Sequence, residues 1–173
     1  LNSLYGAILN PGCRFFDLRI GQSVTLTGRC ITKHMGAKVN EVVTGNYDHR
    51  GEAIIYGDTD SVYFSAYKPL QNEIQSGKIP WQKENIINLY DKISDEVNGS
   101  FTQFMTKAFH CPKTRGEVIA AGRELVASKG LFITKKRYAV LYFDKEGERT
   151  DTAGTPGKMK AMGLDLKRSD TPV

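Results

Sequence analysis

The sequence is constrained most by a short acidic segment between two β-forming runs. Residues 53–56 (AIIY) and 61–64 (SVYF) are rich in β-branched and aromatic residues, and Gly57-Asp58-Thr59-Asp60 separates them. Such runs on either side of turn-forming residues predict two antiparallel strands joined by a tight turn. We therefore expect an acidic hairpin over residues 53–66, with two carboxylates at its tip.

Asp58 and Asp60 stand at the spacing at which side chains of an extended chain point to the same side. Two neighbouring carboxylates repel each other unless a cation lies near them, and Mg²⁺ prefers carboxylate, phosphate and water oxygens. A pair of such metals can act on the attacking and leaving oxygens of a transferred phosphoryl group. We interpret both residues as candidate catalytic and metal-binding residues. The alternative is an ordinary solvated turn.

The remaining pattern predicts an α+β fold, with an antiparallel sheet packed against helices. Apolar residues recur every three to four positions over residues 17–43 and 82–110, which predicts two long helices. Beyond Pro112 the β-forming runs predict strands and one turn. The expected strands are 117–121, 131–134, 138–143 and 159–166, with the turn at 145–147.

Charge and composition point to a polyanionic partner and away from a membrane. The net charge is +5, with 24 Lys and Arg against 19 Asp and Glu, and much of the excess lies in the C-terminal third. No apolar run approaches the roughly 20 residues that span a bilayer, so we expect no membrane partner and a cytoplasmic location, in a host cell if the protein is viral. The 3 cysteines form no CxxC pair, which gives no support to a disulfide framework or a zinc site.

The string Tyr56-Gly57-Asp58-Thr59-Asp60-Ser61 resembles the YGDTDS motif of family B DNA polymerases. In that family the second aspartate ligates the catalytic metals, which implies this role for Asp60, with Asp58 supporting the site. Together with three further segments in the family's order, the resemblance covers essentially the whole chain. The amino-acid sequences of these segments are similar to those of T-even-type bacteriophage replicative polymerases.

Asn2-Ser3-Leu4-Tyr5-Gly6 is similar to the end of the family's KxxxNSLYG motif, on a helix that lines the incoming nucleotide. The resemblance implies nucleotide-binding roles for Asn2, Ser3, Tyr5 and Gly6, with Tyr5 against the nascent base pair. A plain helical turn with Tyr5 in the core is the alternative.

Two basic segments resemble DNA-binding elements of the family. Lys135-Lys136-Arg137-Tyr138 is similar to the KKRY element that contacts the primer-template, and residues 162–172 are similar to the closing palm segment, with Lys167 and Arg168 as candidates. Long cations reach phosphates and minor-groove acceptors without reading a base sequence. Solvated surface lysines are the alternative.

The resemblance implies a single palm-domain fragment over residues 1–173. Residues 1–43 would hold the end of the nucleotide-binding helix and a long helix, and residues 115–173 a basic, strand-rich segment toward the thumb. The sequence starts with Leu1 and stops at Val173, so we expect a piece of a longer polymerase. The exonuclease, an upstream aspartate motif and the thumb would come from the same parent chain or a split partner.

The expected activity is template-directed transfer from a deoxynucleoside triphosphate to a primer 3′-hydroxyl, with Mg²⁺ at a two-metal site, in viral DNA replication. Because the second aspartate motif is missing, we expect the isolated chain to be inactive. Glu117 is a minor candidate for an outer acidic position. Two alternatives remain: a non-enzymatic nucleic-acid-binding module, and another metal-dependent palm such as a nucleotidyl cyclase.

Overall fold

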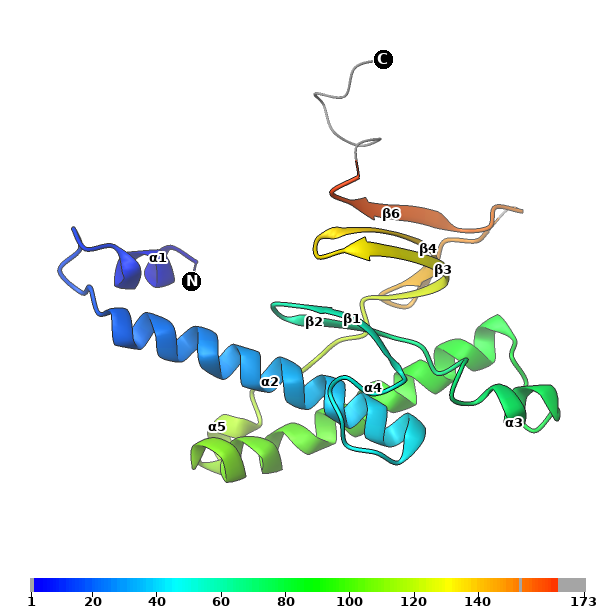
Figure 1. The fold of residues 1–173 in the computed structure, drawn as a ribbon, viewed down its shortest axis with the longest axis horizontal. Helices are drawn as coiled ribbons and strands as arrows, with labels where there is room; N and C mark the ends of the chain where they lie inside the picture. Colours follow the sequence, from blue (N-terminus) through cyan, green and yellow to red (C-terminus); the bar gives the residue numbers. More distant parts are fainter. Residues whose placement is uncertain (1, 153, 165–173) are drawn as a thin grey trace, which may run out of the picture.

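The structure is a computed structural model that describes residues 2–152 and 154–164. It has the expected α+β architecture, in which helices pack against antiparallel β-structure (Figure 1). The β-structure forms two separate sheets rather than one, because no backbone ladder pairs the acidic hairpin with the other described strands.

Two long helices form the base of the molecule. Helix α2 (Leu18–Thr44) begins where the Asp17 carboxylate accepts a hydrogen bond from the Arg19 amide, and it ends at Gly45, whose φ of 80° suits glycine. Helix α4 (Lys83–Phe109) ends at His110, which also takes a left-handed conformation. Both helices lie within two residues of the predicted ranges, so apolar periodicity located them correctly.

Three shorter helices complete the set: α1 (Asn2–Leu9), α3 (Gln71–Gln75) and α5 (Lys113–Gly116). Helix α1 packs on the first turns of α2, where Gly21 leaves room for Leu9; a Cβ at Gly21 would lie 2.0 Å from the Leu9 Cδ2 atom. Within the described ranges, no helix is long and apolar enough to cross a membrane.

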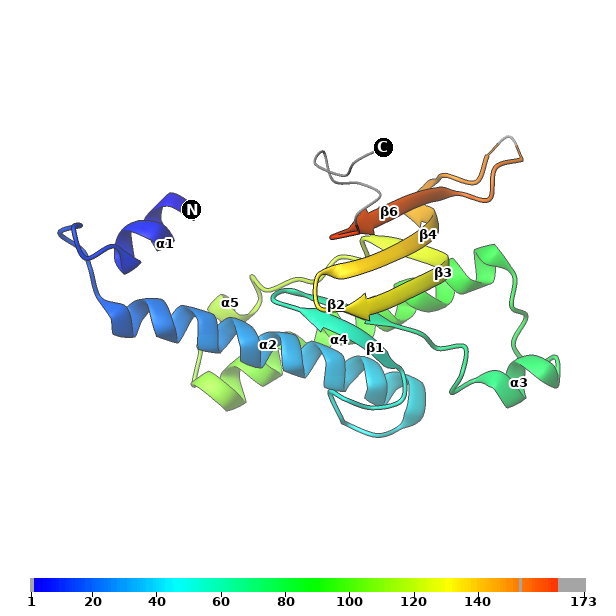
Figure 2. The same ribbon diagram turned by 45° about the horizontal axis from the view of Figure 1, so that its top comes forward.

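The hydrophobic core lies where α2, α4 and the acidic hairpin meet. Val39 of α2 packs with Ile93, Val97 and Phe101 of α4, and all four are almost fully buried. Ile54 and Phe64 of the hairpin pack against this cluster, and the hairpin lies beside α2 in both views (Figures 1 and 2). The hairpin is therefore held directly by the main core.

The hairpin consists of β1 (Ile54–Asp58) and β2 (Ser61–Phe64), as predicted. A second antiparallel sheet contains β3 (Leu125–Thr134), β4 (Arg137–Lys145), β5 (Glu148–Arg149) and β6 (Lys158–Met162). Strand β4 is central, with β3 on one side and both β5 and β6 on the other. The strands predicted at 131–134 and 138–143 and the turn at 145–147 are confirmed, although β3 begins earlier, at Leu125. The last predicted strand, 159–166, is too long: β6 ends at Met162, residues 163–164 are not part of a strand, and residues 165–166 lie outside the described part.

The strand predicted over residues 117–121 is wrong. Helix α5 ends just before it, and residues 117–124 have no regular structure. The Ala121 backbone pairs with side chains of α4 instead: its amide donates to Asn98 Oδ1 at 2.8 Å, and its carbonyl accepts from Asn98 Nδ2 at 3.0 Å. The Ser94 hydroxyl also donates to this carbonyl. Side chains of a helix thus occupy the backbone groups that a strand partner would need.

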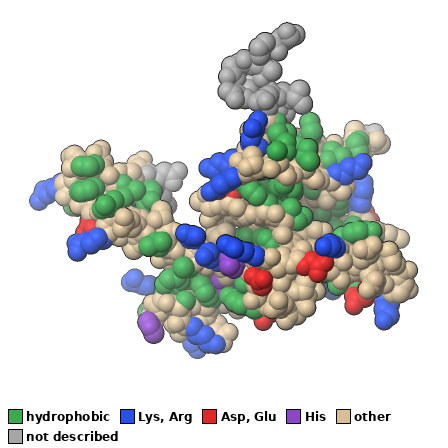
Figure 3. Space-filling view, viewed as in Figure 1, with side chains coloured by type: hydrophobic (Ala, Val, Ile, Leu, Met, Phe, Trp, Pro, Cys, Tyr) green, Lys and Arg blue, Asp and Glu red, His purple; other side chains and the backbone are tan. Residues whose placement is uncertain are grey.

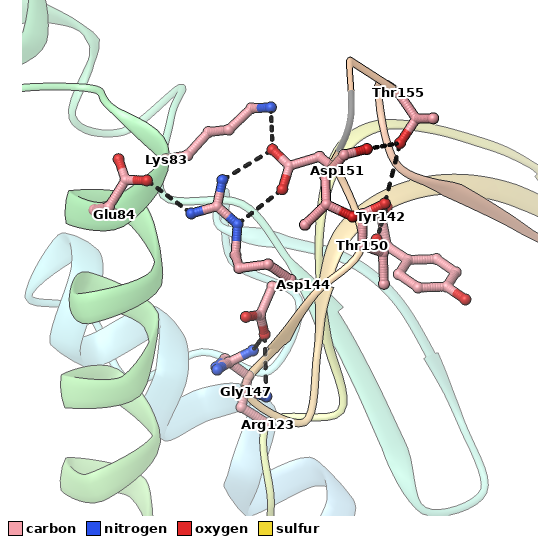
Figure 4. A network of polar contacts seen from close by, with 11 residues as sticks. Lys83, Glu84, Arg123, Tyr142, Asp144, Gly147, Thr150, Asp151 and Thr155 are labelled. Atoms are coloured by element: carbon pink, nitrogen blue, oxygen red, sulfur yellow. Dashed lines mark hydrogen bonds and ion pairs between the residues drawn. The ribbon is translucent and has the colours of Figure 1, made fainter.

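A charged network joins α4 to the second sheet (Figure 4). Arg123 bridges Asp91 of α4 and the buried Asp144 of β4. A second arginine, Arg149, pairs with Glu84 at 2.7 Å and with Asp151 at 2.8 Å, and these contacts hold the pKa of the Asp151 carboxyl well below its usual range. The network fixes how the sheet sits on α4.

Candidate active site

The tip of the acidic hairpin is a tight turn. Asp58 pairs with Ser61 across the hairpin, so Thr59 and Asp60 form the loop between the strands. Thr59 has a φ of 37°, a region that a β-branched residue rarely occupies. Because Asp60 lies in the turn, the alternation rule for strand side chains does not apply to it. The two carboxylates therefore have different surroundings.

Asp58 faces the second sheet. It lies on the same side of β1 as Tyr56, and its side chain is only 17% exposed. Lys135, in the turn between β3 and β4, places its Nζ atom 3.8 Å from Asp58 Oδ1. The Thr59 hydroxyl donates to the same oxygen at 3.2 Å. Asp58 is thus supported by a cation and a hydroxyl.

Asp60 is exposed, and within the described part of the chain its carboxylate makes no hydrogen bond or ion pair. It borders a cleft of about 730 Å³ between α2, the hairpin, α4 and the segment that leads into β3. The lining of the cleft includes the apolar side chains of Met35, Val39 and Phe101. An unpaired carboxylate at the edge of an open cleft is accessible to a cation or a ligand.

An aromatic cluster joins the hairpin to the second sheet. Tyr56 and Tyr63 of the hairpin contact Phe132 and Tyr138, with ring centroids 5.2 to 5.7 Å apart. The Tyr63 hydroxyl donates to the Tyr138 hydroxyl at 3.1 Å. Burial is the main cause that raises the pKa of Tyr63 well above its usual range, and the hydrogen bond to Tyr138 is the second cause. The Tyr63 hydroxyl therefore stays protonated at neutral pH and can donate this hydrogen bond.

The basic turn lies beside the acidic one. Lys136, with a φ of 60°, donates its backbone amide to the Tyr56 hydroxyl at 2.8 Å. Arg137 Nε donates to the Gly163 carbonyl at 3.1 Å. The side chains of Lys135, Lys136 and Arg137 are exposed, whereas Tyr138 is 5% exposed. In Figure 3, several Lys and Arg side chains lie at this end of the upper sheet.

The structure does not bring the other predicted residues to this site. Ser3, Tyr5 and Gly6 lie on α1, which packs on the outer half of α2 (Figure 1), and no hydrogen bond or ion pair between described residues joins α1 to the hairpin. Asn2 begins the same helix. Glu117 is exposed at the end of α5. Lys167 and Arg168 lie outside the described residues.

The donor set fits only part of a magnesium site. Asp60 offers free carboxylate oxygens of the kind that Mg²⁺ prefers, while the charge of Asp58 is balanced in part by Lys135. Among the described residues, no group of three or more His, Cys, Asp or Glu side chains could hold a metal ion. Any metal here would need oxygens from phosphates, water or residues outside this chain.

Comparison with known proteins gives the class to which this fold and site belong. Residues 1–108 match the family model of DNA polymerase family B. Since this match covers more than half of the 173 residues, the chain belongs to DNA polymerase family B. The family inferred from the YGDTDS-type hairpin is thereby confirmed, and the binding-module and cyclase alternatives lose their support.

Phage polymerases are among the similar proteins. Over 99% of its length the chain is 33% identical to the DNA-directed DNA polymerase of Escherichia phage RB69 and 28% identical to that of Enterobacteria phage T4, covering 20% of each. It is 34% identical over 100% of its length to DNA polymerase II of Escherichia coli strain K12, covering 19% of it. The chain therefore spans about a fifth of the length of these relatives.

Sequence reasoning missed three parts of the site: the Lys135 and Asp58 pair, the bond from the Lys136 amide to Tyr56, and Thr32 of α2, whose hydroxyl donates to the Thr59 carbonyl at 2.8 Å. Each joins residues far apart in the sequence, and no local pattern marks them. A hydroxyl within a helical repeat is an ordinary surface or core residue by sequence alone.

Proposed function

We propose that this chain supplies the metal-anchoring and DNA-contacting part of a DNA polymerase active site. The complete protein transfers a nucleotide from a deoxynucleoside triphosphate to a primer 3′-hydroxyl and releases pyrophosphate, in phage DNA replication. The observation that carries the proposal is the tip of the acidic hairpin, where a free carboxylate lies beside a turn of exposed cations. Family membership supplies the class of reaction.

Asp60 is the proposed catalytic metal ligand because it is the unpaired carboxylate at the cleft. Asp58 supports it from within the hairpin. When bound, Mg²⁺ stabilises charge on the transferring phosphoryl group and lowers the pKa of the attacking hydroxyl. The chain's own contribution is a turn held on one side by α2 and on the other by the aromatic cluster. The other carboxylate ligand is proposed to come from a segment outside this chain.

Primer-template DNA is proposed to lie along the basic turn between β3 and β4. The side chains of Lys135, Lys136 and Arg137 are exposed on this turn, so phosphates can reach them, while Lys135 also pairs with Asp58 and Arg137 Nε donates to the Gly163 carbonyl. Tyr138 is buried against Tyr63, so its proposed part is to hold the turn in place. Lys167 and Arg168 are proposed to contact the primer strand further on.

The incoming nucleotide is proposed to meet α1. Ser3 and Gly6 are exposed and Tyr5 is half-buried, which leaves this helix surface open to a ligand. Asn2, Ser3, Tyr5 and Gly6 share a short stretch of one helix, so they can act together on one bound nucleotide. The exonuclease, upstream palm and thumb are proposed to come from the remaining four-fifths of a polymerase of the relatives' length.

Primer extension tests the proposal. The chain alone is compared with RB69 polymerase in which the matching segment is replaced by this chain, and with the same graft carrying Asp60→Ala. We expect extension from the graft, none from the chain alone and none from Asp60→Ala. Extension by Asp60→Ala at the rate of the unmodified graft would overturn the proposed metal anchor.

A graft that fails to fold is recognised by its thermal melting and its affinity for primer-template DNA. In that case the chain is mixed with separately expressed upstream and downstream parts of the RB69 polymerase, and the same comparison is made. Extension in the complete mixture that depends on Asp60 supports the proposal. Full activity of the chain by itself contradicts it.

A further inference from the structure

A hydroxyl on α2 holds the turn that carries Asp60. Thr32 Oγ1 donates to the Thr59 carbonyl at 2.8 Å, and its other contact is the Gly28 carbonyl of its own helix at 3.1 Å. Two other threonines of the long helices, Thr25 and Thr106, bond only to carbonyls of their own helix. Thr32 instead reaches a residue 27 positions away.

The accepted carbonyl is placed to control Asp60. It belongs to the peptide unit that joins Thr59 to Asp60, and a peptide unit is planar. A hydrogen bond to its oxygen therefore fixes the plane from which Asp60 departs. Thr32, Thr59 and Asp60 also border the same cleft.

The turn needs such a contact. Thr59 has a φ of 37°, which is unfavourable for a β-branched residue and persists only where neighbouring structure enforces it. Helix α2 can provide this support because Met35 and Val39, one and two turns beyond Thr32, pack into the cluster around Phe101. The hydroxyl thus links a rigid helix to a strained turn.

We infer that Thr32 is a positioning residue, which holds the Thr59–Asp60 peptide so that the Asp60 carboxylate can take part in metal binding. This inference rests on the proposed function of Asp60. It assigns no contact between Thr32 and the metal or the substrate.

The first test uses the chain itself and does not depend on activity. Manganese is titrated into the ¹⁵N-labelled chain, and line broadening of the amide signals of residues 59–61 is followed. Thr32→Val keeps the shape and removes the hydroxyl, Thr32→Ser keeps the hydroxyl, and Thr106→Val is the matched control. We expect Thr32→Val to raise the manganese concentration at half-broadening about three- to tenfold, the factor for one lost hydrogen bond, and the other two to match the wild type.

Asp60→Ala in the same titration separates the two proposals. If Asp60→Ala leaves the broadening unchanged, the metal role of Asp60 fails and the inference fails with it. If Asp60→Ala abolishes the broadening but Thr32→Val equals Thr106→Val, the metal role stands and the Thr32 inference is overturned. Circular dichroism melting confirms that each variant is folded, and Thr32→Ala replaces Thr32→Val if the valine variant is not.

The second test uses the grafted polymerase. We expect Thr32→Val to lower kcat about tenfold or less and to raise the Mg²⁺ concentration for half-maximal rate, with the KM for primer-template unchanged. A purely structural defect would instead lower the melting temperature and weaken DNA binding as well. An unchanged Mg²⁺ dependence in a folded Thr32→Val graft contradicts the inference.

Discussion

The Lys136 amide donates a hydrogen bond to the Tyr56 hydroxyl at 2.8 Å, although these residues stand 80 positions apart. Tyr56 lies on the same side of β1 as Asp58, so this bond sets the basic turn directly beside the acidic one. The two charged turns are therefore held in one arrangement by neutral contacts, which are less sensitive to salt than the ion pair between the exposed Lys135 and Asp58.

Removing the Tyr56 hydroxyl tests this relationship. We expect Tyr56→Phe to keep the aromatic cluster, to lower the free energy of unfolding by about 1 kcal/mol or less, and to weaken primer-template binding about two- to fivefold. Fluorescence anisotropy with labelled DNA measures the affinity. Tyr67→Phe is the control, since Tyr67 is 45% exposed. Equal effects of the two variants would show that the bond does not position the basic turn.

The basic turn predicts a salt-dependent DNA affinity. We expect Lys135→Ala and Lys136→Ala each to reduce the slope of log K against log salt by about 1, because each removes one phosphate contact. The loss of DNA affinity in each variant should be similar for different DNA sequences. Lys107→Ala, in the last turn of α4, is the exposed control and should leave the slope unchanged. A slope that is unchanged in both test variants would place the DNA elsewhere.

The network around Arg123 predicts unequal effects of its two acidic partners. Asp144 is 2% exposed and Asp91 is 46% exposed, and both bond to Arg123. Figure 4 shows the pair of Arg123 and Asp144. Removing Asp144 leaves the largely buried Arg123 with only the more exposed Asp91 as a partner, so we expect Asp144→Ala to lower the free energy of unfolding by about 3 kcal/mol. Asp91→Ala should lower it by about 1 kcal/mol or less. Urea denaturation measures both, and equal losses would contradict the network as described.

His34 predicts a loss of stability on mild acidification. Its ring accepts or donates bonds to the Tyr47 and Ser100 hydroxyls and stacks on Phe104, and burial lowers its pKa. A lowered folded-state pKa means that the unfolded chain binds the proton more readily. Neutral His34 therefore contributes fully to the free energy of unfolding above the pKa of histidine in the unfolded chain, about 6.5. This contribution is lost as the pH falls from that value toward the lower pKa of His34 in the folded chain.

Thermal melting between pH 7.5 and 5 measures this effect, over a window chosen around the unfolded value of about 6.5. We expect His34→Gln to show a smaller fall in melting temperature than the wild type. His110→Gln changes an exposed histidine and should retain the full fall. If the melting temperatures of both variants fall as much as that of the wild type, His34 is not the group responsible for the loss of stability.

Much of the fold could be predicted because the signals are local. Apolar periodicity located α2 and α4, and the β-branched runs located the hairpin and β4. Residues 117–121 have the composition of a strand, yet Asn98 and Ser94 of α4 bind the Ala121 backbone. That outcome depends on packing against a distant helix, which no local pattern records.

The sequence named candidate residues for the site but did not predict their arrangement. The motif named Asp58 and Asp60 as a pair, but the turn leaves Asp60 free while Asp58 is held by Lys135. The basic motif named Tyr138 with its neighbours, but the aromatic cluster buries it. Thr32 belongs to no sequence motif. Its proposed role rests on the hydrogen bond to the Thr59 carbonyl, which only the fold brings near it.

The central claim is that Asp60 anchors the catalytic metal, and single-turnover nucleotide incorporation by the grafted polymerase tests it most directly. Asp60→Asn, Asp58→Asn and the exposed α4 control Asp95→Asn are compared at saturating DNA, nucleotide and Mg²⁺. We expect Asp60→Asn to lose about 10³-fold or more in rate, since a metal contributes several kcal/mol to transition-state stabilisation. Asp58→Asn should lose less and Asp95→Asn nothing. An Asp60→Asn rate equal to that of Asp95→Asn would contradict the account.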